Sequence, residues 1–190
     1  KYYLFSLMFL CLFLGCEEED SVCDNDFQEI DGLCYNYNDL DILSDFRECS
    51  ELFDDTTSVF DIGNQEWYSG RLTKLNLYYN QLTSLPESIG NLSSLDWLFL
   101  SSNQLTSLPE SIGNLSSLEG LYLEYNQLTS LPESISNLSS LETLYLSYNQ
   151  LTSLPESIGN LSSLELLWLH NNLLTSLPES ISNLSSLETL

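Results

Sequence analysis

The main shortage in this 190-residue sequence is of positive charge. Four lysines and arginines and one histidine stand against 28 aspartates and glutamates, which gives a formal net charge of −24. A nucleic-acid-binding protein needs a basic surface to meet phosphates, and an anionic membrane surface repels such an acidic chain. The single histidine, His170, would have to carry any Ser-His or Cys-His catalysis alone. We therefore expect no nucleic-acid partner, no enzymatic activity and no cofactor.

Long hydrophobic runs are also scarce, and the longest one begins the chain. Residues 2–15 of KYYLFSLMFLCLFLGC carry no charge, but 14 residues form a helix of about 21 Å, shorter than the roughly 30 Å hydrocarbon core of a bilayer. A lysine followed by a short apolar run is typical of a secretory signal peptide. The run ends at Gly15-Cys16, and the acidic residues 17–20 follow directly.

The Gly15-Cys16 junction resembles the processing site of bacterial lipoproteins, in which the cysteine receives the lipid and becomes the new N-terminus. This resemblance implies a signal peptide over residues 1–15, lipidation of Cys16 and an acidic tether over residues 16–22. The protein is then expected in the bacterial cell envelope, on the outer membrane or the cell surface, with the lipid as its contact with the membrane. If Cys16 instead belongs to an ordinary signal peptide, the protein is secreted.

Cysteine occurs five times, an odd number that leaves one thiol over when the others pair. Cys11 leaves with the expected signal peptide, so Cys23, Cys34 and Cys49 remain for a disulfide in an oxidising compartment. We favour the pair Cys23–Cys34, which closes a short loop, and the alternative is Cys34–Cys49. No metal site is expected, because no histidine accompanies these cysteines.

Residues 72–190 repeat with a period of 23. Leu72 opens the first copy, LTKLNLYYNQLTSLPESIGNLSS, and the general pattern is L-x-x-L-x-L-x-x-N-x-L-x-x-L-P-x-x-I-x-x-L-x-x. Five copies are complete and a sixth stops at Leu190, which predicts a longer product, because a solenoid needs a polar cap over its last repeat. The proline in each complete copy excludes a series of amphipathic helices, since it would break every one of them.

This pattern resembles the leucine-rich repeat family in its typical 23-residue class, over residues 72–190. The resemblance implies an α/β solenoid: a right-handed coil with one short strand per repeat and a parallel, concave β-sheet. Side-chain alternation independently places both leucines of Leu75-Asn76-Leu77 on one face of a strand, and stacked copies predict six parallel strands. A structural asparagine column is expected to bond to neighbouring backbone just after the strands: Asn80, Asn103, Asn126, Asn149 and Asn172.

Residues 23–71 are predicted to form a small N-terminal cap over the first repeat. Two leucines and a phenylalanine recur every three residues between positions 40 and 46, which predicts a short amphipathic helix from Asn38 to Cys49. Asn38 is the expected N-cap, and the acidic residues of the first turn suit the positive end of the helix dipole.

The resemblance places ligand-binding residues on the concave face, at the variable positions of each strand. Aromatic residues are concentrated there, although leucines already fill the core. The candidates are rings at the strand positions (Trp97, Phe99, Tyr122, Tyr145, Trp168), rings and a histidine just beyond them (Tyr79, Tyr125, Tyr148, His170), and an acidic column after the opening leucines (Glu119, Glu142, Glu165). Generic β-propensity and cross-strand ring pairing offer a purely structural explanation of the same aromatics.

These features favour a non-catalytic, lipid-anchored binding module whose aromatic and acidic concave face engages a protein partner, one with basic character if the acids contribute. A glycan is the alternative ligand, because aromatic rings also stack on sugars. A second hypothesis is a structural surface spacer or adhesin stalk. A third is that the repeats are the targeting arm of a longer protein whose catalytic domain lies beyond residue 190.

Overall fold

The computed structural model describes residues 23–190; the predicted signal peptide, Cys16 and the predicted tether lie outside the described residues. The regular elements before the repeats are β1 (Phe27–Ile30), β2 (Leu33–Asn36), α1 (Tyr37–Asp45), η1 (Phe46–Glu48), η2 (Val59–Asp61) and β3 (Asn64–Tyr68). The strands of the repeats are β4 (Arg71–Asn76), β5 (Trp97–Phe99), β6 (Gly120–Tyr122), β7 (Thr143–Tyr145) and β8 (Leu166–Trp168). Short 3₁₀ helices return the chain in each repeat: η3 (Glu87–Asn91), η4 (Glu110–Asn114), η5 (Glu133–Asn137), η6 (Glu156–Asn160) and η7 (Glu179–Asn183).

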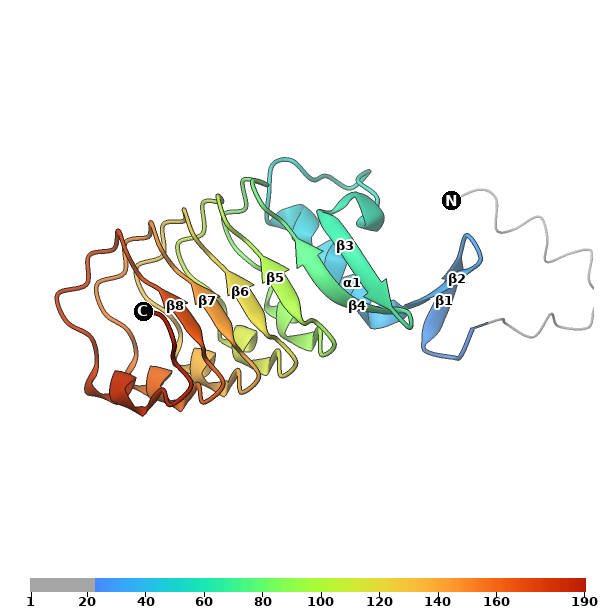
Figure 1. The fold of residues 1–190 in the computed structure, drawn as a ribbon. Coiled ribbons are helices and arrows are strands. Elements are labelled where there is room, and N and C mark those ends of the chain that lie inside the picture. Colours follow the sequence, from blue (N-terminus) through green and yellow to red (C-terminus); the bar gives the residue numbers. More distant parts are fainter. Residues whose placement is uncertain (1–22) are drawn as a thin grey trace, which may run out of the picture.

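The repeats form one continuous sheet with a 3₁₀ helix opposite each strand (Figure 1). Strands β4 to β8 are parallel and in register, so that Leu75, Leu98, Leu121, Leu144 and Leu167 stand side by side. The predicted solenoid with one parallel strand in each complete repeat is confirmed, and the sheet has six strands, but two details differ from the prediction. The first strand of the sheet is β3, which comes from the N-terminal segment and runs antiparallel to β4. The sixth copy contributes only a bridge between Thr189 and Leu166.

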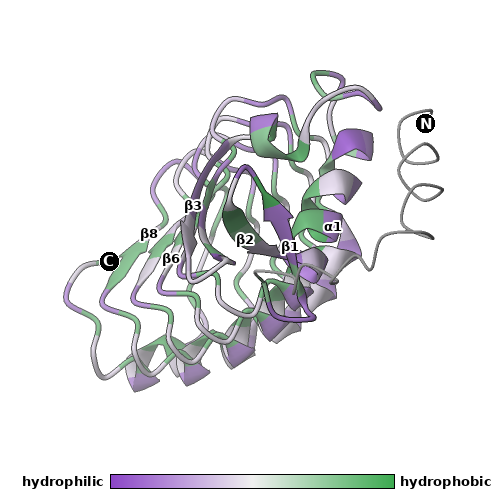
Figure 2. Ribbon diagram, turned by 90° about the vertical axis from the view of Figure 1, so that its right-hand side faces the viewer, coloured by the Kyte–Doolittle hydropathy of each residue, from purple (hydrophilic) through white to green (hydrophobic). Residues whose placement is uncertain are grey.

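The core of the solenoid consists of the leucines and isoleucines of the repeat pattern. In the first repeat, Leu72, Leu75, Leu77, Leu82 and Ile89 are completely buried, and their equivalents up to the fourth copy are buried too. Each 3₁₀ helix of the repeats follows a proline whose φ lies between −69° and −63°. Proline is tolerated there because this position needs no backbone hydrogen-bond donor. The leucines and isoleucines of the first four copies therefore form the interior, and Figure 2 shows hydrophilic residues along the 3₁₀ helices of the repeats.

The asparagine column joins consecutive repeats to one another. Asn126 is buried; its Oδ1 accepts a hydrogen bond from the N–H of Leu105, and its Nδ2 donates to the carbonyl oxygens of Leu100 and Leu123. Asn103, Asn149 and Asn172 repeat this arrangement, but Asn80 only donates to a carbonyl of its own turn. The asparagine side chains thus connect the backbones of consecutive repeats through hydrogen bonds.

Helix α1 covers the first repeat, but its boundaries differ from the prediction. Its N-cap is Asn36, whose Oδ1 accepts from the N–H groups of Asn38 and Asp39, and the α-helix ends at Asp45 before a short 3₁₀ turn. Asn36 caps the helix because it ends strand β2 in an extended conformation, whereas Asn38 already lies inside the first turn. The apolar side of α1 packs into the same core as the repeat leucines, with Leu43 fully buried.

A buried ion pair attaches α1 to the start of the sheet. The Asp39 carboxylate is inaccessible to solvent and accepts hydrogen bonds from Nε and Nη2 of Arg71, at 2.8 and 3.0 Å, and from the N–H of Leu72 at 2.9 Å. These bonds raise the pKa of the Arg71 guanidinium above its usual value. The cap and the first repeat therefore share one charge-assisted junction.

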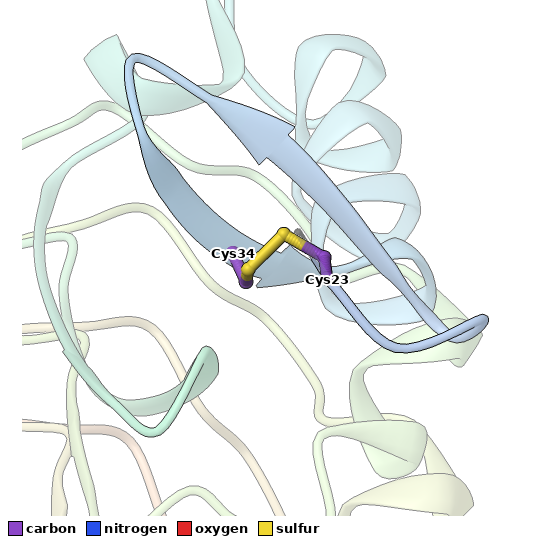
Figure 3. The surroundings of a disulfide bond; sticks show 2 residues. All are labelled: Cys23 and Cys34. Atoms are coloured by element: carbon purple, nitrogen blue, oxygen red, sulfur yellow. A yellow bond between two sulfur atoms is a disulfide. The ribbon is translucent and has the colours of Figure 1, made fainter. Parts of the chain in front are cut away.

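The β1–β2 hairpin carries a disulfide. Cys23 and Cys34 are bonded to each other, with their Cα atoms 5.6 Å apart (Figure 3). The alternative pair Cys34–Cys49 is therefore not formed: Cys49 is a buried thiol against the first repeat, and its burial raises its pKa. Within residues 23–190, no helix is long and apolar enough to span a membrane, and no three potential metal ligands gather in one place.

Candidate functional site

The exposed face of the sheet bears two columns of side chains that run across the repeats. The residues between the strand leucines point away from the core, and we call the run Phe99, Tyr122, Tyr145 and Trp168 the ring column. Three residues further along each repeat the chain has left the strand. We call the set found there the tyrosine column: Tyr79, Ser102, Tyr125, Tyr148 and Asn171.

The rings of the ring column contact one another from repeat to repeat. Phe99 and Tyr122 stack with centroids 4.4 Å apart, Tyr122 meets Tyr145 edge to face at 5.0 Å, and Tyr145 stacks on Trp168 at 4.2 Å. Trp97, two residues before Phe99 on the same strand, also lies against Tyr122, with ring centroids 6.2 Å apart. Such pairs contribute about 0.5–1.5 kcal/mol each beyond the area that they bury. The result is a continuous, half-exposed aromatic strip over four repeats.

One end of the ring column holds a cation. The Lys74 ammonium lies 5.7 Å from the centroid of the Phe99 ring and pairs with the Glu66 carboxylate at 2.6 Å. The lysine is therefore held between a ring face and a carboxylate, an arrangement that combines cation–π attraction with an ion pair.

The tyrosine column continues the aromatic surface beyond the strands. Tyr125 and Tyr148 stack with centroids 4.3 Å apart, and Tyr148 meets His170 edge to face at 5.3 Å. His170 also lies 6.2 Å from Trp168, so it joins the two columns. Its Nδ1 is 2.9 Å from Oγ of Ser147, but that serine is almost completely buried. A buried hydroxyl cannot reach a substrate, so this Ser–His contact is structural.

Every member of the tyrosine column has a left-handed backbone, with φ between 55° and 59°. This conformation is unfavourable for residues other than glycine, and asparagine tolerates it best among the rest. Asn171 accordingly occupies the position in the fifth repeat, whereas three tyrosines occupy it elsewhere. The tyrosines are kept at a conformational cost, which is typical of positions with a role besides folding.

Replacing Tyr79 with asparagine should therefore stabilise the fold by about 0.5–1 kcal/mol. Tyr79 is 70% exposed, and among the rings of residues 23–190 it contacts only that of its neighbour Tyr78, so the substitution loses little packing. Chemical denaturation of the two proteins measures the difference. The control is Tyr78→Asn, an exposed neighbour outside the left-handed set; a gain for Tyr78→Asn, or a loss for Tyr79→Asn, would contradict the argument from conformation.

The predicted acidic column lies at the edge of the sheet, not among the rings. Glu119, Glu142 and Glu165 each stand one residue before a strand, and each backbone carbonyl oxygen accepts hydrogen bonds from two consecutive N–H groups of the next repeat. Glu142 and Glu165 are exposed and Glu119 is half-buried. The acids therefore border the ring column along its N-terminal side.

Glu124 is a carboxylate on the exposed face itself that sequence reasoning missed. It stands between Tyr122 and Tyr125, is half-buried, and accepts a hydrogen bond from Oγ of Ser101. Partial burial, a neighbouring tyrosine hydroxyl and the Glu124 charge together raise the pKa of both Tyr122 and Tyr125. Glu124 lies one residue before the tyrosine column. The four other complete copies carry serine, tyrosine or histidine at this position, so the single acid there is the signal that could have identified it.

The comparisons agree with this geometry. The family model for the leucine-rich repeat region matches residues 68–144 and 120–190, and the chain belongs to the leucine-rich repeat family. The comparison with curated proteins gives no match.

Solved structures with the same fold come from bacteria and plants. A leucine-rich repeat protein of Leptospira interrogans is 37% identical, with a TM-score of 0.61, over 69% of this chain and 38% of its own. An internalin from Listeria monocytogenes is 32% identical, with a TM-score of 0.54, over 62% and 34%. The BIR3–SERK2 complex of Arabidopsis thaliana matches at 27% identity and a TM-score of 0.59, over 80% and 91%. This chain thus spans little more than a third of the two bacterial structures.

Proposed function

We propose that this chain is a non-catalytic binding module of the bacterial cell envelope, anchored by a lipid on Cys16, and that its exposed sheet face engages a protein partner. The observation that carries the proposal is the ring column, in which four consecutive repeats present rings in mutual contact. The leucines fill the core without these rings, so the aromatic area is available to a partner. Aromatic side chains of this kind dominate the binding energy of protein interfaces.

The stacking geometry favours a protein over a glycan. A sugar ring binds an aromatic side chain by lying flat on its face. In the ring column, Phe99 and Tyr122 cover one face of each other at 4.4 Å, as do Tyr145 and Trp168 at 4.2 Å. The outward ring edges and tyrosine hydroxyls suit a surface that combines apolar contact with hydrogen bonding, which protein partners provide. The plant neighbour, solved as a complex of two proteins, is consistent with this use of the fold.

The proposal is tested by paired capture. The parent chain and the triple variant Tyr122→Ala, Tyr145→Ala, Trp168→Ala are immobilised, and envelope proteins and glycans are passed over both. We expect a protein that the parent retains and the variant loses by at least about tenfold, because these rings are the expected hot spot.

The matched control removes three side chains from the return path. Ser130→Ala, Ser153→Ala and Ser176→Ala replace exposed residues of the same three repeats as Tyr122, Tyr145 and Trp168 and should leave capture unchanged. Circular dichroism and cooperative unfolding establish that both triple variants are folded. Equal retention by the ring variant and the parent would reject the exposed face as the binding surface, and retention of nothing by the folded parent would favour the structural spacer.

A further inference from the structure

The tyrosine column is interrupted at Ser102, and the interruption leaves one ring face open. Tyr125 stacks on Tyr148 through one face, and within residues 23–190 Tyr148 is the only ring that contacts it. On the other side the neighbouring repeat carries Ser102, which has no ring. Tyr125 is 55% exposed. We call this place, bounded on its far side by the exposed Tyr78 and Tyr79, the Ser102 break.

A carboxylate lies on the same side of Tyr125 as the break. Glu124 precedes Tyr125, and its carboxylate reaches back to Oγ of Ser101, in the repeat that also contains Ser102. In the described part of the chain, the two ion pairs are Arg71–Asp39 and Lys74–Glu66, which leaves Glu124 half-buried without a cation. A partly desolvated carboxylate gains more from a cation than an exposed one does.

At another place on the exposed face, the protein already binds a cation of its own between a ring and a carboxylate. At the end of the ring column, Lys74 lies over the Phe99 ring and bonds to the Glu66 carboxylate. The Ser102 break presents the same two groups, a ring face and a carboxylate, with no cation of residues 23–190 between them.

We propose that the Ser102 break binds an arginine side chain of the protein partner, with the guanidinium flat on the open face of Tyr125 and paired with the Glu124 carboxylate. Arginine suits the place better than lysine, because its planar group stacks on a ring and bonds to a carboxylate through two N–H groups at once. A basic partner segment is also attracted by the net charge of −24. The inference rests on the proposed function, since it names the chemistry that the partner brings to the exposed face.

The probe is the peptide acetyl-Gly-Arg-Gly-amide, and the reference is the same peptide with citrulline, which keeps the shape but lacks the charge. Both are titrated against the full chain at physiological salt, with the ring resonances of the tyrosines observed by NMR. We expect saturable shifts at Tyr125 with the arginine peptide and at least about tenfold weaker binding of the citrulline peptide.

Three variants separate this site from general electrostatics. Glu124→Gln should weaken binding of the arginine peptide about tenfold, whereas Glu119→Gln, which removes the same charge at the sheet edge, should change it less than about twofold. Ser102→Tyr should abolish binding, because it would continue the column and cover the open face; the left-handed backbone there already carries tyrosine in three other repeats. Equal effects of the two Gln variants, unchanged binding by Ser102→Tyr, or no saturable binding by the parent would each overturn the proposal.

The outcome is distinct from that of the capture experiment. If the ring column retains a protein but the arginine peptide does not bind, the proposed function stands and the arginine site is wrong. If the peptide binds at Tyr125 while the parent and the ring variant retain partners equally, the arginine site stands and the role of the ring column is wrong.

Discussion

Replacing Asp39 with alanine is expected to lower the free energy of unfolding by about 3–5 kcal/mol, because it leaves a buried junction without its acceptor. The Asp39 carboxylate accepts two hydrogen bonds from Arg71 and one from the N–H of Leu72. The Leu72 N–H is completely buried with its residue, so no water replaces the lost oxygen. Chemical denaturation followed by circular dichroism measures the effect.

The control for this prediction lies on the same helix. Asp41 is exposed and makes no ion pair among the described residues, so Asp41→Ala should change stability by less than about 0.5 kcal/mol. Asp39→Asn should fall in between, because an amide oxygen still accepts hydrogen bonds but carries no charge for Arg71. A loss below about 1 kcal/mol for Asp39→Ala would show that the cap contributes little to the stability of the repeats.

The second large effect is expected in the middle of the asparagine column. Asn126→Ala removes the partners of three backbone groups, the N–H of Leu105 and the carbonyl oxygens of Leu100 and Leu123. Each buried group left without a partner costs about 1–3 kcal/mol, so we expect a total loss of about 3 kcal/mol or more. The two strands that Asn126 joins should also exchange their amide hydrogens faster than the rest of the sheet.

Asn80 provides a matched control, because it is the same residue at the same position of the repeat. It is half-buried, and its amide donates one hydrogen bond to the Tyr78 carbonyl oxygen. Asn80→Ala should therefore cost about 1 kcal/mol or less. Equal losses for the two alanine variants would contradict the claim that the cross-repeat bonds, and not the asparagine type, carry the stabilisation.

The repeats could be predicted well from the sequence because their constraints are local and recur. Leucine spacing determines which side chains are buried in each turn, and the fixed period places equivalent residues side by side, so the family assignment and the positions of Tyr122 and Tyr145 follow from counting. The N-terminal cap does not recur. Its strand β3 forms an antiparallel hairpin with β4, and neither that strand nor the capping role of Asn36 has a periodic signal.

Glu124 and the open face of Tyr125 were not predicted, because both depend on departures from the repeat pattern. Glu124 is a single carboxylate in a position that serine, tyrosine or histidine occupies in the other copies, and the direction of its side chain is set by the hydrogen bond to Ser101 in the previous repeat. Counting columns reveals which residues share a face. It does not reveal that Tyr148 covers one face of Tyr125, because that depends on the orientation of the two rings; the open face is on the side of Ser102, in the previous repeat.

Hydroxyl-radical footprinting of the chain, alone and bound to the protein that it retains, tests most directly whether the exposed sheet face is the binding surface. Oxidation of the ring column and of Tyr125 and Tyr148 should fall sharply on binding, while Leu177 and the other exposed side chains of the return path keep their reactivity. Unchanged oxidation of the rings, with protection confined to the return path and its 3₁₀ helices, would contradict the account.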